Sequence, residues 1–187
     1  MGLDMYLRAS KYVSGYDFRG EQEVAFYRRL VEEFGVEEFI DPDSPSATVE
    51  FTIGYWRKAN QIHAWFVDNV QGGVDECQPA YVSREQLSEL RETCLRVLAS
   101  TKLIPGTVHN GTVYNAEHPK GAVQLEEGQI VADPRVAEEL LPPQSGFFFG
   151  NDDYDQWYWQ DLELTVKQID RALAMPEDWS FEYQSSW

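Results

Sequence analysis

The side chains best suited to chemistry in this chain lie in a polar and aromatic run over residues 54–69. The run is expected to form a helix, and residues three or four positions apart share one side of a helix. Trp56, Asn60 and His63 then face one way, and Arg57 lies three residues before Asn60. An indole, an amide and an imidazole so placed suit a planar polar ligand, and the Arg57 guanidinium suits a phosphate or carboxylate.

Two other interpretations of the same residues stay open. His63 falls on an apolar stripe with Ile62 and Phe66, where a single histidine is more often a hydrogen-bonded core residue than a catalyst. An imidazole with an ordinary pKa near 6.5 could instead act as a general base. A buried amide or imidazole without a partner costs ~1–3 kcal/mol, so Asn60 and His63 need partners if they are buried.

A second group of candidate residues lies where a helix is expected to begin near residue 152. Asp152 is the expected helix cap, and the carboxylates around it make this helix start unsuitable for a phosphate. Exposed aromatic side chains beside carboxylates suit a protein surface that carries Arg or Lys. The expected partner-binding residues are Asp152, Asp153, Trp157 and Trp159. Trp157 is expected to pack inward and Trp159 to point elsewhere, and core packing is the alternative role for both.

The sequence lacks the patterns of several site classes. Cys77 lies in a polar loop and Cys94 on the apolar stripe of an expected helix, without CxxC spacing, and the three histidines form no HxxxH pair. The acidic residues near position 152 do not follow the calcium-loop spacing. Phosphate-binding, dinucleotide-binding, nucleophile-elbow and HExxH motifs are also missing. We therefore expect no metal and no cofactor, and the sequence favours a protein that is not an enzyme.

Charge restricts the partners that this chain can bind. It has 187 residues, with 15 Lys plus Arg against 32 Asp plus Glu, a formal net charge of −17. Such a chain should be repelled by nucleic acid and by anionic lipid. It suits a small polar or anionic ligand in a shielded pocket, or a basic host protein surface. No run of ~18 apolar residues is present, so no membrane span and a cytoplasmic location are expected. The composition does not define an oligomeric state.

Hydrophobic periodicity predicts the elements that position these residues. Alternation predicts strands at 3–8, 48–55 and 179–183, and an apolar run predicts a buried strand at 147–149. A period of 3.6 predicts helices at 21–34, 56–70, 83–100 and 152–173, with a short helix at 133–141. Ser83 and Gln86 have the spacing of a capping box. Residues 10–20 are expected to form a loop.

These elements predict an α+β fold in one domain over residues 1–187. The short alternating strands favour a mainly antiparallel sheet with helices packed on one face. Glycines punctuate residues 101–132, which are expected to form a β-hairpin insertion within the domain.

Three blocks of the sequence, Met1–Leu7, Gly54–Val67 and Gln144–Gly150, carry a family resemblance. Together they resemble a family of small bacteriophage and bacterial proteins whose members sometimes carry a phosphoglycerate kinase label. The chain lacks the nucleotide-phosphate loop that this label would require. The resemblance implies a setting in the bacterial cytoplasm during phage infection, or in a prophage, and it supplies no activity.

These observations lead to one main hypothesis and two alternatives. The main hypothesis is a non-enzymatic phage-type accessory protein that binds a small polar ligand or a host protein, and that modulates or inhibits host defence. The first alternative is an enzyme acting on a nucleotide-like or phosphorylated small molecule, with His63 as acid or base. The second is an acidic nucleic-acid mimic that occupies a DNA- or RNA-binding protein, which predicts strongly salt-dependent binding.

Overall fold

The main sheet is built around β1 (Asp4–Ser14), which pairs on both sides with antiparallel neighbours. The strand order is β2-β1-β6-β3, with β2 at Ser46–Arg57, β3 at Ala80–Val82 and β6 at Ser180–Ser186. This computed structural model describes residues 2–113, 115–119, 121–146 and 149–187. Alternate residues of β1 are buried and face the helices, as expected for a strand with one covered face.

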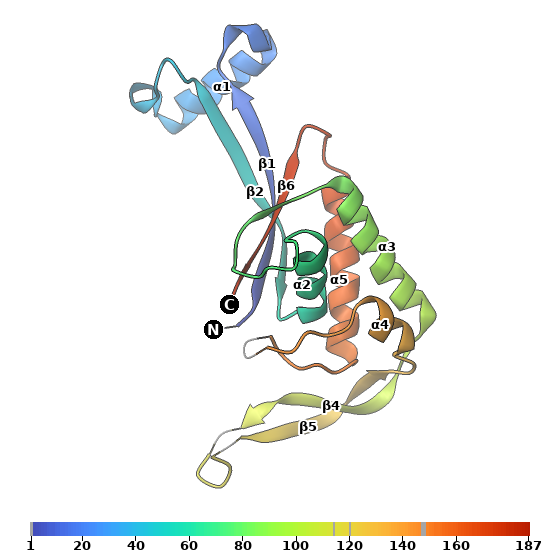
Figure 1. The fold of residues 1–187 in the computed structure, drawn as a ribbon. Coiled ribbons are helices and arrows are strands. Elements are labelled where there is room, and N and C mark those ends of the chain that lie inside the picture. Colours follow the sequence, from blue (N-terminus) through green and yellow to red (C-terminus); the bar gives the residue numbers. More distant parts are fainter. Residues whose placement is uncertain (1, 114, 120, 147–148) are drawn as a thin grey trace.

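Helices cover one face of this sheet (Figure 1). They are α2 (Asn60–Asn69), α3 (Arg84–Ser100) and α5 (Gln156–Leu173), with the short α4 (Arg135–Leu140) beside them. Leu90 and Cys94 of α3 and Leu162 and Ile169 of α5 are fully buried, and they join the sheet residues in one core. The predicted α+β class, with an antiparallel sheet and helices on one face, is therefore confirmed.

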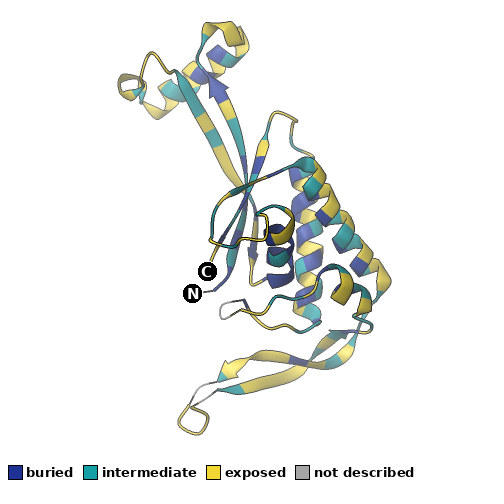
Figure 2. Cartoon of the chain, viewed as in Figure 1, coloured by how far each residue is buried: buried dark blue, intermediate teal, exposed yellow. Residues whose placement is uncertain are grey.

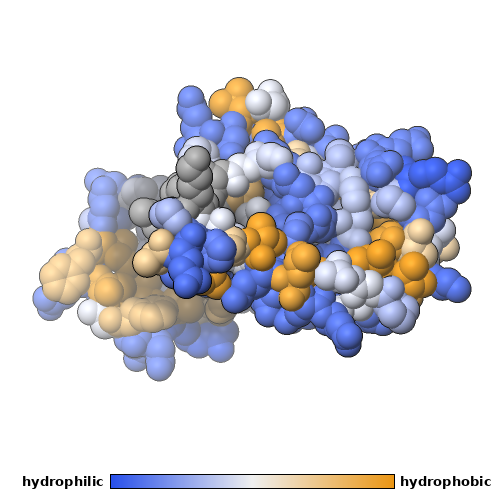
Figure 3. Space-filling view, turned by 90° about the horizontal axis from the view of Figure 1, so that it is seen from below, coloured by the Kyte–Doolittle hydropathy of each residue, from blue (hydrophilic) through white to orange (hydrophobic). Residues whose placement is uncertain are grey.

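Two parts of the chain, an arm that carries the first helix and a β-hairpin, project from opposite ends of this core (Figure 1). The outer halves of β1 and β2 extend away from the helices and carry α1 (Glu21–Phe34), flanked by 3-10 turns at Asp17–Arg19 and Glu37–Phe39. At the other end, β4 (Leu103–Val113) and β5 (Ala122–Val131) form the predicted hairpin. Figure 2 shows that both projections are largely exposed, whereas the buried residues gather between them. From below, hydrophobic side chains form separate small groups among hydrophilic ones (Figure 3).

Buried polar side chains of α5 attach this helix to β2. The amide of Gln168 donates to the Tyr55 carbonyl oxygen at 3.1 Å and accepts from the Tyr55 N–H. The neighbouring position 54 accommodates only glycine, because a Cβ there would lie 2.8 Å from the Gln168 Oε1 atom. The Trp56 indole donates to Thr165 Oγ1 at 2.8 Å. These bonds fix the end of β2 against α5, directly beside the candidate site.

Two predicted boundaries are wrong because the pairing between β1 and β2 extends further than the local sequence pattern indicates. The helix predicted from Trp56 begins only at Asn60, because Trp56 and Arg57 stay paired with β1. The loop predicted at 10–20 begins later, because β1 continues to Ser14 through its pairing with β2. The strand predicted at 147–149 rests mainly on residues 147 and 148, which lie outside the described residues.

The cap of α5 is Asp155, which corrects the assignment of that role to Asp152. The buried Asp155 carboxylate accepts from the backbone N–H groups of Trp157 at 2.8 Å and Tyr158 at 3.1 Å. Asp152 is exposed and accepts from the Ser145 hydroxyl instead. At the start of α3, the predicted capping box of Ser83 and Gln86 is confirmed.

Replacing Asp155 by alanine should lower the free energy of unfolding by about 1–2 kcal/mol, the usual effect of losing a helix cap. Asp152→Ala provides a matched control and should change that free energy by less than about 0.5 kcal/mol. Urea-induced unfolding, followed by tryptophan fluorescence, measures both. Equal effects of the two substitutions would contradict the assignment of the cap.

Among the described residues, no helix is long and apolar enough to cross a membrane.

Candidate functional site

A cleft of about 660 Å³ lies where four segments of the chain meet. Its walls are the end of β2 with the first turn of α2, the loop before α5, the first two turns of α5, and the outer part of the β4–β5 hairpin. The hairpin is held there because the Val131 N–H donates to the Tyr154 carbonyl oxygen at 2.9 Å. The lining residues used below are Arg57, Lys58, Asn60, Gln61, His109, Asp153, Trp157 and Asp161.

Two cations stand at one wall of the cleft. Arg57 and Lys58 are both exposed, and neither forms an ion pair with any residue that the structure describes. Lys58 has a φ of +62°, a left-handed conformation that non-glycine residues rarely adopt. Gly150 packs against it, and a Cβ at Gly150 would lie 3.3 Å from the Lys58 Cβ. Strained backbone of this kind is concentrated at functional sites.

Asp161 supplies a carboxyl group to the cleft from the second turn of α5. Burial raises its pKa to about 7, the Gln61 amide opposes this rise, and the Asp155 charge adds to it. The bond from Gln61 Nε2 to the Asp161 carboxylate measures 3.2 Å. A carboxyl group with this pKa exists in both protonation states near neutral pH, so it can donate or accept a hydrogen bond.

The hairpin and the start of α5 complete the cleft. The His109 Nδ1 atom of β4 contacts the Asp153 carboxylate of the loop before α5, which links the hairpin to the body of the protein. Trp157 keeps 45% of its surface exposed and lines the cleft. An exposed indole in a cleft that also holds two cations provides a flat apolar surface for a ligand ring.

Of the ligand-binding residues predicted from the sequence, Arg57 and Asn60 line this cleft. Asn60 is already saturated by the protein. Its Nδ2 group donates to the carbonyl oxygens of Phe149 at 3.2 Å and Asn151 at 2.9 Å, and its Oδ1 atom accepts from the Gln144 N–H at 3.1 Å. Asn60 therefore fixes the loop that forms one wall. Trp56 is fully buried against α5 and does not line the cleft.

His63 lies in the core and does not line the cleft. Its Nε2 atom lies 2.9 Å from an Asp75 carboxylate oxygen, and its Nδ1 atom lies 2.8 Å from the Tyr183 hydroxyl. Because a carboxylate only accepts, Nε2 carries the proton and Nδ1 accepts from Tyr183. Burial lowers the pKa of His63, although Asp75 opposes this effect. The imidazole is thus a satisfied, neutral core group at pH 7.

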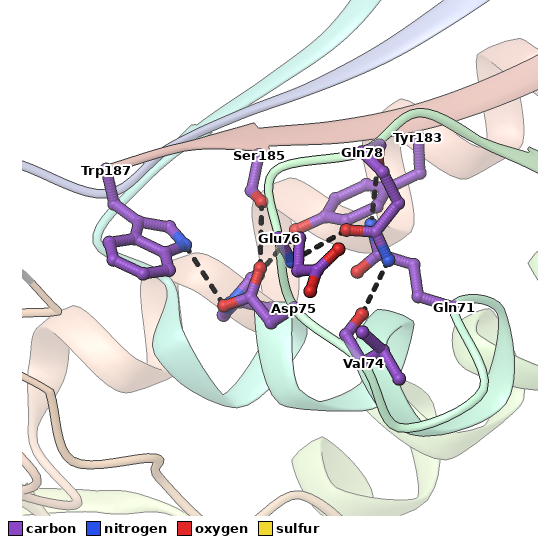
Figure 4. Close-up of polar contacts among 9 residues, drawn as sticks. Gln71, Val74, Asp75, Glu76, Gln78, Tyr183, Ser185 and Trp187 are labelled. Carbon is purple, nitrogen blue, oxygen red and sulfur yellow. Dashed lines mark hydrogen bonds and ion pairs between the residues drawn. The ribbon is translucent and has the colours of Figure 1, made fainter.

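Asp75 joins His63 to the C-terminal strand. Its carboxylate also accepts from the Ser185 hydroxyl at 3.4 Å and from the Trp187 indole at 3.0 Å, so β6 and the loop after α2 converge on it (Figure 4). Gln71 and Gln78 close the same loop by hydrogen bonds to backbone carbonyl oxygens (Figure 4). The network fastens this loop and the C-terminus to α2.

Two of the four predicted partner-binding residues line the cleft. Asp153 and Trp157 line the cleft, whereas Asp152 is exposed in the loop. Trp159 packs against the core, and its indole donates to Glu163 at 3.1 Å. The expected orientations of the two tryptophans are therefore reversed, since Trp157 is the more exposed side chain.

Sequence reasoning missed Lys58, Gln61, His109 and Asp161 as residues of the site. Asp161 had a usable signal, because it follows Trp157 by four residues and adjoins the apolar face of a helix that otherwise buries hydrophobic residues. His109 had no such signal, because only the folded hairpin brings it to α5. Within the described residues, no group of His, Cys, Asp and Glu is arranged to hold a metal ion.

Comparisons with protein-family models, with curated proteins and with solved structures found no match to this chain.

Proposed function

We propose that this protein binds a small polar ligand with an anionic group in the cleft between α2, α5 and the β4–β5 hairpin. The observation that carries the proposal is the convergence on one cleft of Arg57 and Lys58 from the end of β2 with Trp157 and Asp161 from α5. Arg57 and Lys58 would pair with the anionic group, and Trp157 would cover a ring or an apolar part of the ligand. Asp161 would exchange hydrogen bonds with its polar groups.

The energetics of the cleft residues support this proposal. Arg57 and Lys58, which have no ion-pair partner among the described residues, the left-handed backbone of Lys58, and the partly buried carboxyl group of Asp161 each reduce the stability of the fold or contribute nothing to it. A ligand anion would satisfy the cations, and a ligand donor would satisfy the carboxylate form of Asp161. Such poorly satisfied groups in a cleft are typical of binding sites.

The biological setting is proposed on the family resemblance of the sequence. An accessory protein acting in the bacterial cytoplasm during phage infection would meet nucleotides, sugar phosphates and other small anions there. Sequestering or sensing one of them, in order to modulate a host defence, requires binding alone and no catalysis.

A catalytic role is the second candidate, and Asp161 is the observation that favours it. A carboxyl group with a pKa of about 7 is suited to proton transfer near neutral pH, and it lines the cleft, whereas His63 does not. An enzyme acting on a phosphorylated small molecule would therefore use Asp161 as its acid or base. Turnover of a bound ligand that Asp161→Asn abolishes, while binding persists, would favour this candidate over simple binding.

We expect the double substitution Arg57→Ala with Lys58→Ala to weaken binding of a small anion by at least about 100-fold, because it removes both cations of the cleft. A thermal-shift screen of nucleotides, sugar phosphates and dicarboxylates would identify a ligand, and isothermal titration calorimetry would measure its affinity. Lys102→Ala, at an exposed lysine outside the cleft lining, is the matched control and should bind like the wild type. Unchanged affinity in the double variant would contradict the proposed site.

A further inference from the structure

The apolar stripe of α1 is covered only along its first half. Val24 and Tyr27 are buried, Leu30 and Val31 are partly exposed, and Phe34 at the end of the helix keeps 75% of its surface exposed. These residues follow the three- and four-residue spacing of a single helix face. The second half of this face therefore has no partner among the described residues.

A local core holds α1 in a defined position at the end of the arm. The Tyr27 ring packs so closely on Gly15 that a Cβ there would lie 2.5 Å from it. The Gly15 N–H donates to the Pro45 carbonyl oxygen at 2.7 Å, and the Glu23 carboxylate accepts from the Ser14 N–H at 2.9 Å. These contacts make the arm a fixed support, and the exposed helix face is presented on it.

The segment after α1 adds a second exposed ring. Gly35 ends the helix in a left-handed conformation with a φ of +62°, and Phe39 follows in a 3-10 turn with 83% of its surface exposed. Removing apolar surface from water is favourable, and large exposed apolar side chains that lie together often mark interaction sites. We name Leu30, Val31, Phe34 and Phe39 the arm face.

Charge around the arm face selects the kind of partner. Residues 28–45 include six Asp and Glu against two cations, Arg28 and Arg29, so the end of the arm carries an excess of negative charge. None of the six carboxylates forms an ion pair with a residue that the structure describes. Their mutual repulsion would be relieved by a cationic surface. A second copy of the chain, which would bring the same six charges, is disfavoured, and so are nucleic acid and anionic lipid.

We propose that the arm face docks onto a protein whose surface combines Lys or Arg with an apolar pocket. Phe34 and Phe39 enter the apolar part, and the surrounding carboxylates pair with the cations. This inference concerns the end of the molecule opposite the hairpin (Figure 1), and it does not depend on a ligand in the cleft.

Selection of a phage-displayed library of random peptides on the full-length protein tests the chemistry of this partner directly. We expect the selected peptides to be enriched in Lys and Arg together with Leu or aromatic residues. Their affinity, measured by fluorescence anisotropy, should fall by at least about tenfold in the double variant Phe34→Ala with Phe39→Ala, because two anchoring rings are lost. It should also fall steeply as salt is raised.

Leu125→Ala removes an exposed apolar side chain from the hairpin and is the matched control, with no expected change in peptide affinity. Circular dichroism should show that all variants remain folded, because the replaced rings are exposed. Peptides without basic residues, or affinity that is the same in the Phe34/Phe39 variant, would overturn the proposal. Self-association in analytical ultracentrifugation that this variant abolishes would also overturn it, in favour of a second copy.

Discussion

Replacing His63 by alanine should lower the free energy of unfolding by about 3–5 kcal/mol. The side chain is fully buried, so its loss leaves a cavity between α2 and β6. The Tyr183 hydroxyl loses its acceptor, and Asp75 loses one of its three donors. A buried hydroxyl without a partner adds ~1–3 kcal/mol to the effect. Urea-induced unfolding, followed by tryptophan fluorescence, measures the change.

The matched control for His63 is His118→Ala, which removes an exposed imidazole from the hairpin loop and should change stability by less than about 0.5 kcal/mol. The pH dependence gives a second check. The pKa of His63 is lowered in the folded state, so the unfolded chain binds more protons below about pH 6.5. Stability should therefore fall as the pH is lowered through this range, and His63→Gln should remove that part of the fall. A wild-type profile that His63→Gln leaves unchanged would contradict the buried neutral imidazole.

Replacing Asp161 by asparagine should stabilise the protein, in contrast to the His63 substitution. It should raise the free energy of unfolding at about pH 8 by roughly 2–4 kcal/mol. Burial raises the folded-state pKa of this carboxyl to about 7, above its ordinary value of 3.8. The contribution of Asp161 to stability is thus fully present below about pH 4, and it is lost as the pH rises through about 7. Asparagine keeps the shape of the side chain and can still accept from Gln61, but it carries no charge to bury.

Unfolding measured at about pH 4 and about pH 8 separates this effect from a general change in packing, because Asp161→Asn should be nearly neutral at the lower pH. Glu163→Gln removes an exposed carboxylate from the same helix and serves as the control, with no comparable pH dependence. A substitution that removes a residue kept for function can stabilise the protein, so a gain in stability in Asp161→Asn would indicate a functional role for Asp161. If Asp161→Asn destabilised the protein equally at both pH values, Asp161 would be a structural residue.

Local signals in the sequence predicted much of the fold. The helix at 21–34 was predicted to its last residue because Gly35 supplies the left-handed stop, and the start of α3 was predicted because Ser83 and Gln86 form a capping box. Errors arose where tertiary pairing overrides local pattern. The periodicity around Trp56 is helical, but pairing with β1 keeps that residue in a strand.

The candidate site was only partly accessible to sequence reasoning. Helical spacing groups Arg57 and Asn60, which line the cleft, with Trp56 and His63, which the folded protein buries elsewhere. The spacing of residues along one helix does not indicate which other element of the protein covers each face of that helix. Asp161 and His109 reach the cleft from segments far away in the chain, and for His109 only its position in the folded protein reveals a place in the site.

Nuclear magnetic resonance of the 15N-labelled protein tests the central claim most directly, with a titration of the best-binding small anion from the thermal-shift screen. We predict shifts concentrated at the backbone amides of Arg57 and Lys58 and at the indole N–H of Trp157, with no shifts in the Arg57→Ala and Lys58→Ala double variant. Binding that shifts resonances elsewhere and leaves these three unmoved, or the lack of any binding anion in the screen, would contradict a ligand site in the cleft.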